Sequence, residues 1–272
     1  VGYFKLDDAS GTTAVDSASA GNDGTLQNGA EFVSEVLDRN AVAAHVSKHA
    51  SFDGIVGASG DNIAIPDNAA YETSTLSVEV WFRAETVQES GASYHRLVTK
   101  PTSGNGNVFS LGFTEATGQL FGAAGNSIIT PHSGVGPDLR DGEWHHAAMT
   151  MQPGTNASSL YLDGVLIHTG TQGSVAGDGS PLMIGDYDDD GSHPENFKGD
   201  IADVRVWSDI RTQAEIADNL LTDLTGAESG LVGAWKLDGE ANGTVTDLSP
   251  TLNDGTLQNG ASIAETTLLA VL

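Results

Sequence analysis

Apolar residues recur at every second position in several short stretches of the chain, and turn-forming sequences separate these stretches. A period of two is typical of strands that bury one face in a core. The stretch 75–83 has this period, and 143–151 repeats it. In 159–168 two apolar runs are joined by Asp163-Gly164, a dipeptide that favours the tight turn of a hairpin. The residues of 75–83 that we expect in the core are Leu76, Val78, Val80 and Phe82.

The stretch 201–207 also alternates, and only 211–221 has the spacing of an amphipathic helix. Many short strands and a single late helix predict an all-β fold, a two-sheet antiparallel jelly-roll sandwich. Strict alternation in 201–207 would place Ile201, Asp203, Arg205 and Trp207 on one face and Ala202, Val204 and Val206 on the other. In the helix the expected buried residues are Ile216, Leu220 and Leu221.

The chain carries 37 acidic and 11 basic side chains among 272 residues, a formal net charge of -26. This charge repels phosphate backbones and anionic lipid, so we expect no nucleic-acid partner and no membrane insertion. No apolar run approaches the roughly 18 to 20 residues of a membrane span. Without cysteine, a domain of this kind outside the cell depends on a large core or on bound calcium.

The first thirty residues return near the end of the chain at a constant offset of 231 residues, with sixteen of thirty positions identical. We call residues 1–30 the first copy and residues 232–261 the second copy. The second copy either begins a next unit of a tandem array or supplies closing strands to the same sandwich. We therefore divide the chain into a domain of residues 1–230 and a repeated segment of residues 231–272. The opening residues lack the features of a signal peptide, so we expect a piece of a longer protein with neighbouring domains.

The stretch "DYDDDGSHPEN" (186–196) begins with the alternating aspartates and glycine of a calcium loop. Phe197 stands where an EF-hand needs a bidentate glutamate, so this is no EF-hand. Closely packed carboxylates repel one another unless a cation lies between them. The stretch is therefore either a calcium site on another scaffold or a solvated acidic loop.

The strands follow one another in an order that resembles a known family. The segments are "SFDG…DNIAIPDN", "LSVEVWFR", "RLVTK", "FSLGF", "DGEWHHAAMT", "SLYLDGVLIH", "LMIGD" and "GDIADVRVWSDIRTQAEI". Together, over roughly residues 50–220, they resemble the laminin-G-like or pentraxin-like concanavalin A-type jelly roll. That fold hosts lectins, adhesion modules, glycan-binding modules and glycosidases, so the fold alone does not give the function.

The resemblance implies calcium ligands in the loop after "LMIG", because pentraxins hold calcium partly in that loop. Pentraxins add an Asp-Asn pair from an earlier strand, where this sequence has Gly106 and Asn107, so a two-calcium arrangement is in doubt. A second group flanks "NIAIP", near the place where related domains fix a structural calcium, although turn residues bounding a strand explain it equally well. The predicted ligands are Asp186, Asp188, Asp189, Asp190, Asn107, Asn196 and Glu195, and those of the second group are Asp53, Asp61 and Asn62.

The carboxylates on the strands do not have the arrangement of a glycosidase. Glu79 and Glu85 share a strand face, but six residues of strand separate them by roughly 20 Å, too far for a catalytic pair. Glu79 and Asp203 could come closer, but Arg83 and Arg205 share their faces and favour a structural ion cluster. We therefore expect no enzyme.

These observations predict a calcium-dependent carbohydrate-binding or adhesion module of a secreted or surface-displayed bacterial protein. Tyr187 and His193 lie within the acidic loop and are the residues expected to contact the sugar, although Tyr187 could instead pack down as a loop anchor. One alternative is a structural spacer that calcium stiffens. Another is a glycan-binding module attached to a polysaccharide-degrading enzyme.

Overall fold

The computed structural model describes residues 13–14, 24–25, 38–55, 60–86, 88, 93–103, 106–125, 127–154, 156–173, 176–187 and 195–265. The chain divides into two compact units, Val1–Ala41 and Val42–Leu272. In the first unit, β1 (Thr13–Ala14) and β2 (Gly24–Thr25) pair antiparallel. Within the described ranges, no helix is long and apolar enough to cross a membrane.

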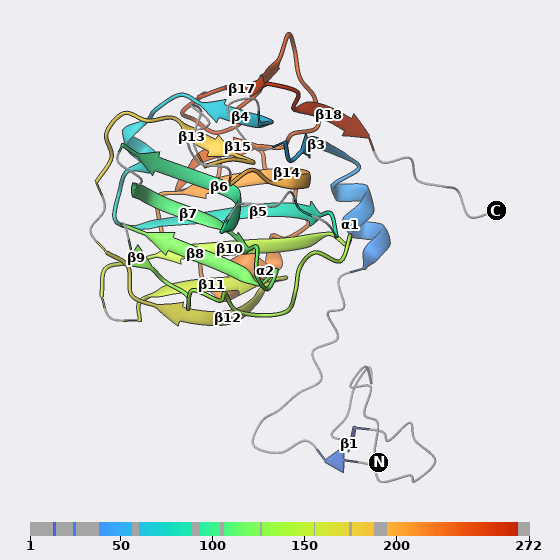
Figure 1. The fold of residues 1–272 in the computed structure, drawn as a ribbon, viewed down its shortest axis with the longest axis vertical. Helices are drawn as coiled ribbons and strands as arrows, with labels where there is room; N and C mark the ends of the chain where they lie inside the picture. Colours follow the sequence, from blue (N-terminus) through green and yellow to red (C-terminus); the bar gives the residue numbers. More distant parts are fainter. Residues whose placement is uncertain are drawn as a thin grey trace, which may run out of the picture. The chain divides into compact units, whose positions relative to one another are not determined.

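The second unit is a sandwich of two antiparallel sheets (Figure 1), which confirms the predicted fold class. The front sheet has the order β16-β17-β4-β13-β6-β7-β8-β9, and the back sheet has the order β12-β11-β10-β5-β14-β3-β18, with β15 also paired to β14. The front strands are β4 (Asn62–Ile65), β6 (Tyr94–Thr102), β7 (Gly106–Thr114), β8 (Leu120–Ala124), β9 (Ser127–Ile128), β13 (Leu182–Ile184), β16 (Thr244–Val245) and β17 (Gly255–Gln258). The back strands are β3 (Lys48–Asp53), β5 (Leu76–Ala84), β10 (His145–Met151), β11 (Ser158–Leu162), β12 (Val165–Gly170), β14 (Lys198–Trp207), β15 (Leu231–Trp235) and β18 (Ser262–Glu265).

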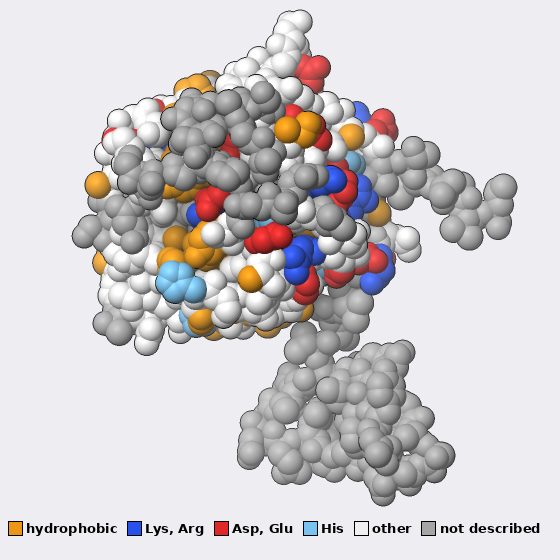
Figure 2. Space-filling model, in the orientation of Figure 1, with side chains coloured by type: hydrophobic (Ala, Val, Ile, Leu, Met, Phe, Trp, Pro, Cys, Tyr) orange, Lys and Arg blue, Asp and Glu red, His pale blue; other side chains and the backbone are white. Residues whose placement is uncertain are grey.

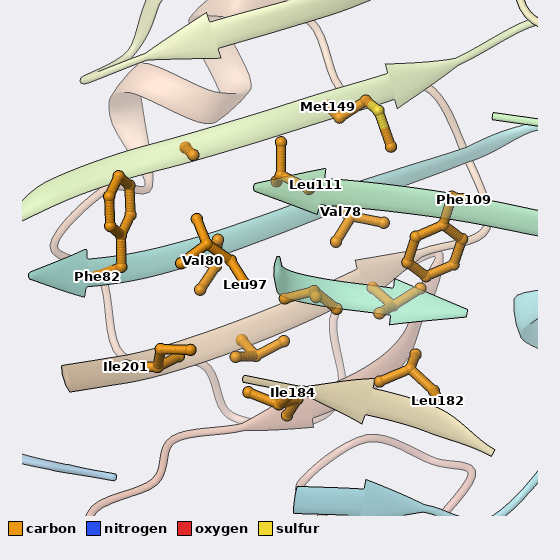
Figure 3. Packing of buried hydrophobic residues seen from close by; sticks show 14 of the residues in the cluster. Val78, Val80, Phe82, Leu97, Phe109, Leu111, Met149, Leu182, Ile184 and Ile201 are labelled. Atoms are coloured by element: carbon orange, nitrogen blue, oxygen red, sulfur yellow. The ribbon is translucent and has the colours of Figure 1, made fainter. Parts of the chain in front are cut away.

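The core lies between the two sheets, where alternate side chains of each sheet interdigitate (Figure 3). The four residues predicted from 75–83 are all buried there, on β5. From the front sheet they meet side chains such as Leu97, Phe109 and Leu111. The predicted hairpin is also confirmed, because β11 and β12 pair across Asp163-Gly164, with both turn residues at positive φ.

The face assignment along 201–207 is wrong in part, because β14 contains a bulge. Its register against β5 shifts between Ala202 and Arg205, and Asp203 adopts φ 47. The extra residue reverses the alternation, so that Ile201 joins Val204 and Val206 in the core.

The described residues include three helical segments, of which the sequence predicted only the last. They are α1 (Arg39–His45), which spans the boundary between the units, the 3-10 turn η1 (Ala69–Tyr71), and α2 (Gln213–Asp218). A capping box made by Thr212 and Glu215 starts α2, where the sequence predicted a helix. The chain just beyond α2 lies on the outer face of the back sheet, because Trp81 donates its Nε1 proton to Leu220 O at 2.9 Å.

The strands of the second copy are divided between the two sheets. Strand β15 pairs with β14 in the back sheet, while β16 and β17 extend the front sheet beside β4. Just beyond the copy, β18 pairs with β3. This pairing favours closing strands of the same sandwich over the start of a next unit.

Candidate functional site

The two groups of predicted ligands lie at the same end of the front sheet. Strand β4 begins at Asn62 and β13 ends at Ile184, and the antiparallel register pairs Ile63 with Ile184. Asp61 and Asp186, each just outside its strand, therefore lie at one edge of the sandwich. Both are buried. Gly185 makes the turn possible, since it has φ +86 and a Cβ there would meet the Phe52 ring at 2.6 Å.

Two buried amides at this edge have polar atoms without partners. Asn196 is 3% exposed, and neither Oδ1 nor Nδ2 of its side chain has a hydrogen-bond partner among the described residues. Asn62 Oδ1 is likewise buried without one within the same described ranges, while Asn62 Nδ2 donates to Gly60 O at 3.1 Å. Gly60 also lies against Asn196, because a Cβ at Gly60 would fall 2.0 Å from Asn196 Nδ2. Buried groups left in this state cost about 1–3 kcal/mol each, which suggests that they face a ligand.

The carboxyl of Asp61 is part of the same edge. Burial raises its pKa, although the Asp53 N–H donates to Asp61 Oδ2 at 3.0 Å and acts in the opposite direction. The charge of Asp53 adds to the increase. A bound cation would favour the ionised form of this carboxyl.

Arg96 on β6 connects this edge to a cluster of aromatic rings. Its Nε donates to Glu195 Oε2 at 2.8 Å, next to Asn196, and its backbone N–H donates to Glu195 O. The guanidinium carbon lies 4.8 Å from the ring centre of Tyr94, 4.9 Å from that of Phe121 and 5.1 Å from that of Tyr187. The arrangement fixes the aromatic rings relative to the residues that enter and leave the acidic loop.

A pocket of about 340 Å³ opens beside Tyr94. Its walls include Glu115 and His132, and the Tyr94 hydroxyl lies 3.3 Å from His132 Nδ1. We call Asp61, Asn62, Asp186 and Asn196 the amide edge. His95 links the pocket to it, because its Nδ1 lies 2.8 Å from Asn196 O and its Nε2 lies 2.5 Å from Glu115 Oε2.

Figure 2 shows the outer face of the front sheet, where acidic and basic side chains lie mostly in the right half.

The structure places the predicted loop residues differently from one another. Tyr187 is buried and its hydroxyl donates to Gly106 O at 2.7 Å, which favours the loop-anchor alternative. The same bond brings the start of the acidic loop to the residue before Asn107. Glu195 is engaged by Arg96. Asp188, Asp189, Asp190 and His193 lie outside the described residues.

No group of three histidine or carboxylate side chains suited to a metal occurs in the part of the chain that the structure describes. A cation at the amide edge would therefore need amide oxygens as ligands in addition to the carboxylates. Tyr94, Arg96 and Phe121 were not selected from the sequence. The alternation of Tyr94 and Arg96 was a usable signal for a shared face, but their contact with Phe121 depends on strand pairing.

The strand carboxylates form ion pairs on the outer face of the back sheet. Asp203 accepts from Arg205 Nη2 at 2.6 Å and from His45 Nε2 at 2.7 Å. Arg205 also donates to two carbonyls of the segment after α2, those of Asn219 and Thr222. Glu79 is 1% exposed and lies 3.3 Å from His146 Nε2. Asp203 and Arg205 therefore form a buried ion pair, and Asp203 also borders a pocket.

A further pocket, of about 590 Å³, lies beside this ion cluster. Acidic side chains, including Asp223 and Asp238, share its walls with Lys236, Leu224 and Leu248. Lys236 Nζ donates to Asp223 Oδ1 at 2.6 Å, so its charge is already neutralised. The pocket is separate from the amide edge.

The two antiparallel sheets define a jelly-roll β-sandwich domain. Residues 57–217, more than half of the chain, match the family model described as the concanavalin A-like lectin/glucanases superfamily, of the laminin G type. The chain belongs to this family.

Comparison with individual proteins gives distant relatives. A rat protein, the sushi, von Willebrand factor type A, EGF and pentraxin domain-containing protein 1, is 27% identical over 168 residues. The match covers 59% of this chain but 4% of that protein, so the chain spans a small part of this curated relative. Among solved structures, a candidate carbohydrate-binding protein of Bacteroides ovatus has a TM-score of 0.61 at 20% identity, covering 93% of this chain and 66% of its own. A SAP-like pentraxin of Limulus polyphemus has a TM-score of 0.52 at 15% identity, covering 84% and 99%. At these identities both structures establish the fold alone.

Proposed function

We propose that this protein is a non-catalytic, calcium-dependent carbohydrate-binding module of a secreted or surface-displayed bacterial protein. The observation that carries the proposal is a set of buried amide atoms without a hydrogen-bond partner among the described residues, next to Asp61 and Asp186. They are both polar side-chain atoms of Asn196 and Oδ1 of Asn62. Amide oxygens in this state next to carboxylates have the chemistry that calcium prefers. The family and the resemblance in fold to a candidate carbohydrate-binding protein support a glycan as partner.

Calcium would be held by oxygen ligands from both predicted groups. Asp186 and Asn196 stand at the two ends of the acidic loop, and Asp61 and Asn62 approach from β4. Asp188, Asp189 and Asp190 belong to the same loop and complete the proposed donor set. When bound, the ion offers positions at which sugar hydroxyls can replace water. The chain's own residues fix the loop ends through Arg96 and Glu195.

Tyr94 is the ring best placed to contact a sugar. Its side chain is partly exposed beside the pocket of about 340 Å³, whereas Tyr187 is buried. Phe121 lies 4.2 Å away, centre to centre, and holds the Tyr94 ring in place. A rigid, half-exposed aromatic ring covers the apolar side of a pyranose with little loss of side-chain entropy.

The absence of catalysis is inferred from the pairing of the strand carboxylates. Glu79 is 1% exposed and lies 3.3 Å from His146 Nε2. Asp203 borders the pocket of about 590 Å³, but it is paired with Arg205 and His45. Secretion and surface display are inferred from the family, and the high negative charge is compatible with them.

The test is binding of the full chain to a panel of polysaccharides, measured with calcium, with magnesium and with a calcium chelator. Calcium-dependent binding that Tyr94→Ala weakens at least tenfold, with the thermal midpoint unchanged, supports the proposal. Tyr161→Phe is the control, since Tyr161 lies on β11 of the opposite sheet and packs against Ile216 of α2. A rise in midpoint with calcium but no glycan bound would identify a calcium-stiffened spacer. Release of reducing sugar that Glu79→Gln abolishes would identify an enzyme.

A further inference from the structure

The two copies of the repeat form the same hairpin. In the first copy Thr13 pairs with Thr25 and Ala14 pairs with Gly24. In the second copy Thr244 pairs with Thr256 and Val245 pairs with Gly255. Each pairing is displaced by the same 231 residues that relate the sequences. The described strands of the first copy therefore have the hairpin register of a closing segment.

In the second copy this hairpin is completed by another strand. Thr256, Leu257 and Gln258 of β17 pair with Ala64, Ile63 and Asn62 of β4. The hairpin of the first copy forms a two-stranded sheet that gains no third strand within the described part of the chain. Two strands alone are marginally stable in water, so a third strand or a packed face is needed.

The identical positions include those that bind the second copy to the rest of the sandwich. Asn253 Nδ2 donates to Pro66 O at 2.7 Å, and Asn259 Nδ2 donates to Gly60 O at 2.8 Å. Lys236 Nζ donates to Asp223. All three partners lie outside the copy. The first copy carries the same residue types at the equivalent places, which are Asn22, Asn28 and Lys5.

Two glycines of the second copy lie against β4 and the residue before it. A Cβ at Gly255 would lie 2.3 Å from Ile65 Cδ1, and a Cβ at Gly260 would lie 2.5 Å from Asp61 Oδ1. Neither glycine has the positive φ that would require glycine in a turn. A side chain at Gly255 would collide with Ile65 of β4, and one at Gly260 would collide with Asp61, the residue before β4. The first copy has glycine at both equivalent positions, Gly24 and Gly29.

We infer that residues 1–30 are a second closing segment, whose partner is the β4 edge of another sandwich of this same type. The partner sandwich is that of a second copy of this chain. The contacts would be main-chain pairing with β4 and the amide contacts seen for the second copy. Such a segment links sandwiches by strand addition.

The lack of cysteine in the chain allows a clean disulfide trap. Ala64 pairs directly with Thr256, and paired strand positions have the Cα separation that a disulfide needs. The full chain with Ala64→Cys and Thr256→Cys should cross-link within one molecule. The full chain with Ala64→Cys and Thr25→Cys reports whether the first copy reaches a β4 edge.

Competition between the copies decides the expected result. In the Thr25→Cys trap, adding Gly255→Val overpacks the second copy against Ile65 and should raise the cross-linked fraction roughly tenfold. Adding Gly24→Val as well should remove the gain, because the first copy then meets the same obstruction. Mass spectrometry of the cross-linked peptides and light scattering distinguish a cross-link between molecules, which supports the inference, from one within a chain, which would overturn it.

Near-ultraviolet circular dichroism confirms that each variant is folded. A folded Gly255→Val variant without any link between positions 25 and 64, while the control forms the link between 64 and 256, would overturn the inference. Should Gly255→Val fail to fold, a synthetic peptide of residues 1–30 with Thr25→Cys is added to the folded Ala64→Cys chain. Failure of that peptide to cross-link in excess over a Gly24→Val peptide would overturn it equally.

Discussion

Arg96 binds Glu195 through two nitrogens, with Nε 2.8 Å and Nη2 2.7 Å from the same carboxylate oxygen. Glu195 immediately precedes Asn196, whose side chain faces the amide edge. The pair therefore joins the aromatic cluster on the front sheet to the end of the acidic loop. Both side chains are largely buried, so the interaction is sensitive to the loss of either partner.

Replacing Arg96 should destabilise the protein and weaken calcium binding together. Arg96→Met leaves Glu195 buried without its cation, and we expect a loss of about 3 kcal/mol in the free energy of unfolding. Urea titration with and without calcium measures both effects. Arg140→Met is the control, since Arg140 pairs with Asp138 near the surface and should lose less than about 1 kcal/mol. Equal losses in the two variants would contradict the role given to Arg96.

Asn196→Ala should separate calcium binding from folding. Removing an unpartnered buried amide relieves its desolvation, so the calcium-free stability should change by less than about 1 kcal/mol. In the parent protein, calcium at a hundred times its dissociation constant should add about 2.7 kcal/mol, and the variant should lose most of this increment. Differential scanning calorimetry measures both quantities. Asn40→Ala, on an exposed helical position, should keep the full calcium increment.

Local patterns in the sequence were sufficient to predict most of the strands. Strand β5 follows its alternation because it pairs with β10 without a register shift, and the extra residue of the bulge lies on β14. Strand β14 departs from alternation at Asp203, where it contains a bulge. Asp203 there contacts His45, which is distant in sequence, and Arg205, which the bulge brings to the same face. A period-two pattern carries no information about such contacts.

The candidate site was predictable in its residue types but not in its assembly. No local pattern indicated that Asp61 and Asn62 would join Asp186 and Asn196, because that juxtaposition depends on the pairing of β4 with β13 across about 120 residues of chain. Tyr187 looked like a contact residue since it lies in a polar loop. Its burial depends on Arg96 and Gly106, which belong to other strands.

Removing Asp203 should destabilise the back sheet strongly. Burial alone would raise the pKa of Asp203, but hydrogen bonding from His45 and the charge of Arg205 hold it well below its usual range. Asp203→Ala leaves the buried Arg205 guanidinium without its carboxylate and should cost about 3–5 kcal/mol. Asp223→Ala is the matched control, because Asp223 binds the same Lys236 but its side chain is 77% exposed. Chemical denaturation should show less than about 1 kcal/mol of loss for the control.

The acid side of the stability profile tests the same pair. A carboxyl whose folded pKa is depressed stabilises the protein above its unfolded pKa of about 3.9, and this contribution is lost as the pH falls through the folded value. The parent protein should therefore lose more stability below about pH 4 than Asp203→Ala does. An identical acid profile in the two proteins would show that Asp203 is not a major determinant of acid unfolding.

His145 should give the opposite dependence, on the alkaline side of neutrality. Burial lowers its pKa, but Asp163 at 3.0 Å and Asp141 at 3.3 Å outweigh burial, and the net effect is a raised pKa. A histidine of this kind stabilises the fold fully below its unfolded pKa of about 6.5, and the contribution disappears as the pH rises through the folded value. Thermal midpoints measured from pH 6 upward should therefore fall more in the parent than in His145→Gln. Asp163→Asn keeps the oxygen that accepts from the His146 N–H but removes the charge, so it should flatten the profile in the same way. A parent-like slope in both variants would show that other groups control stability in this range.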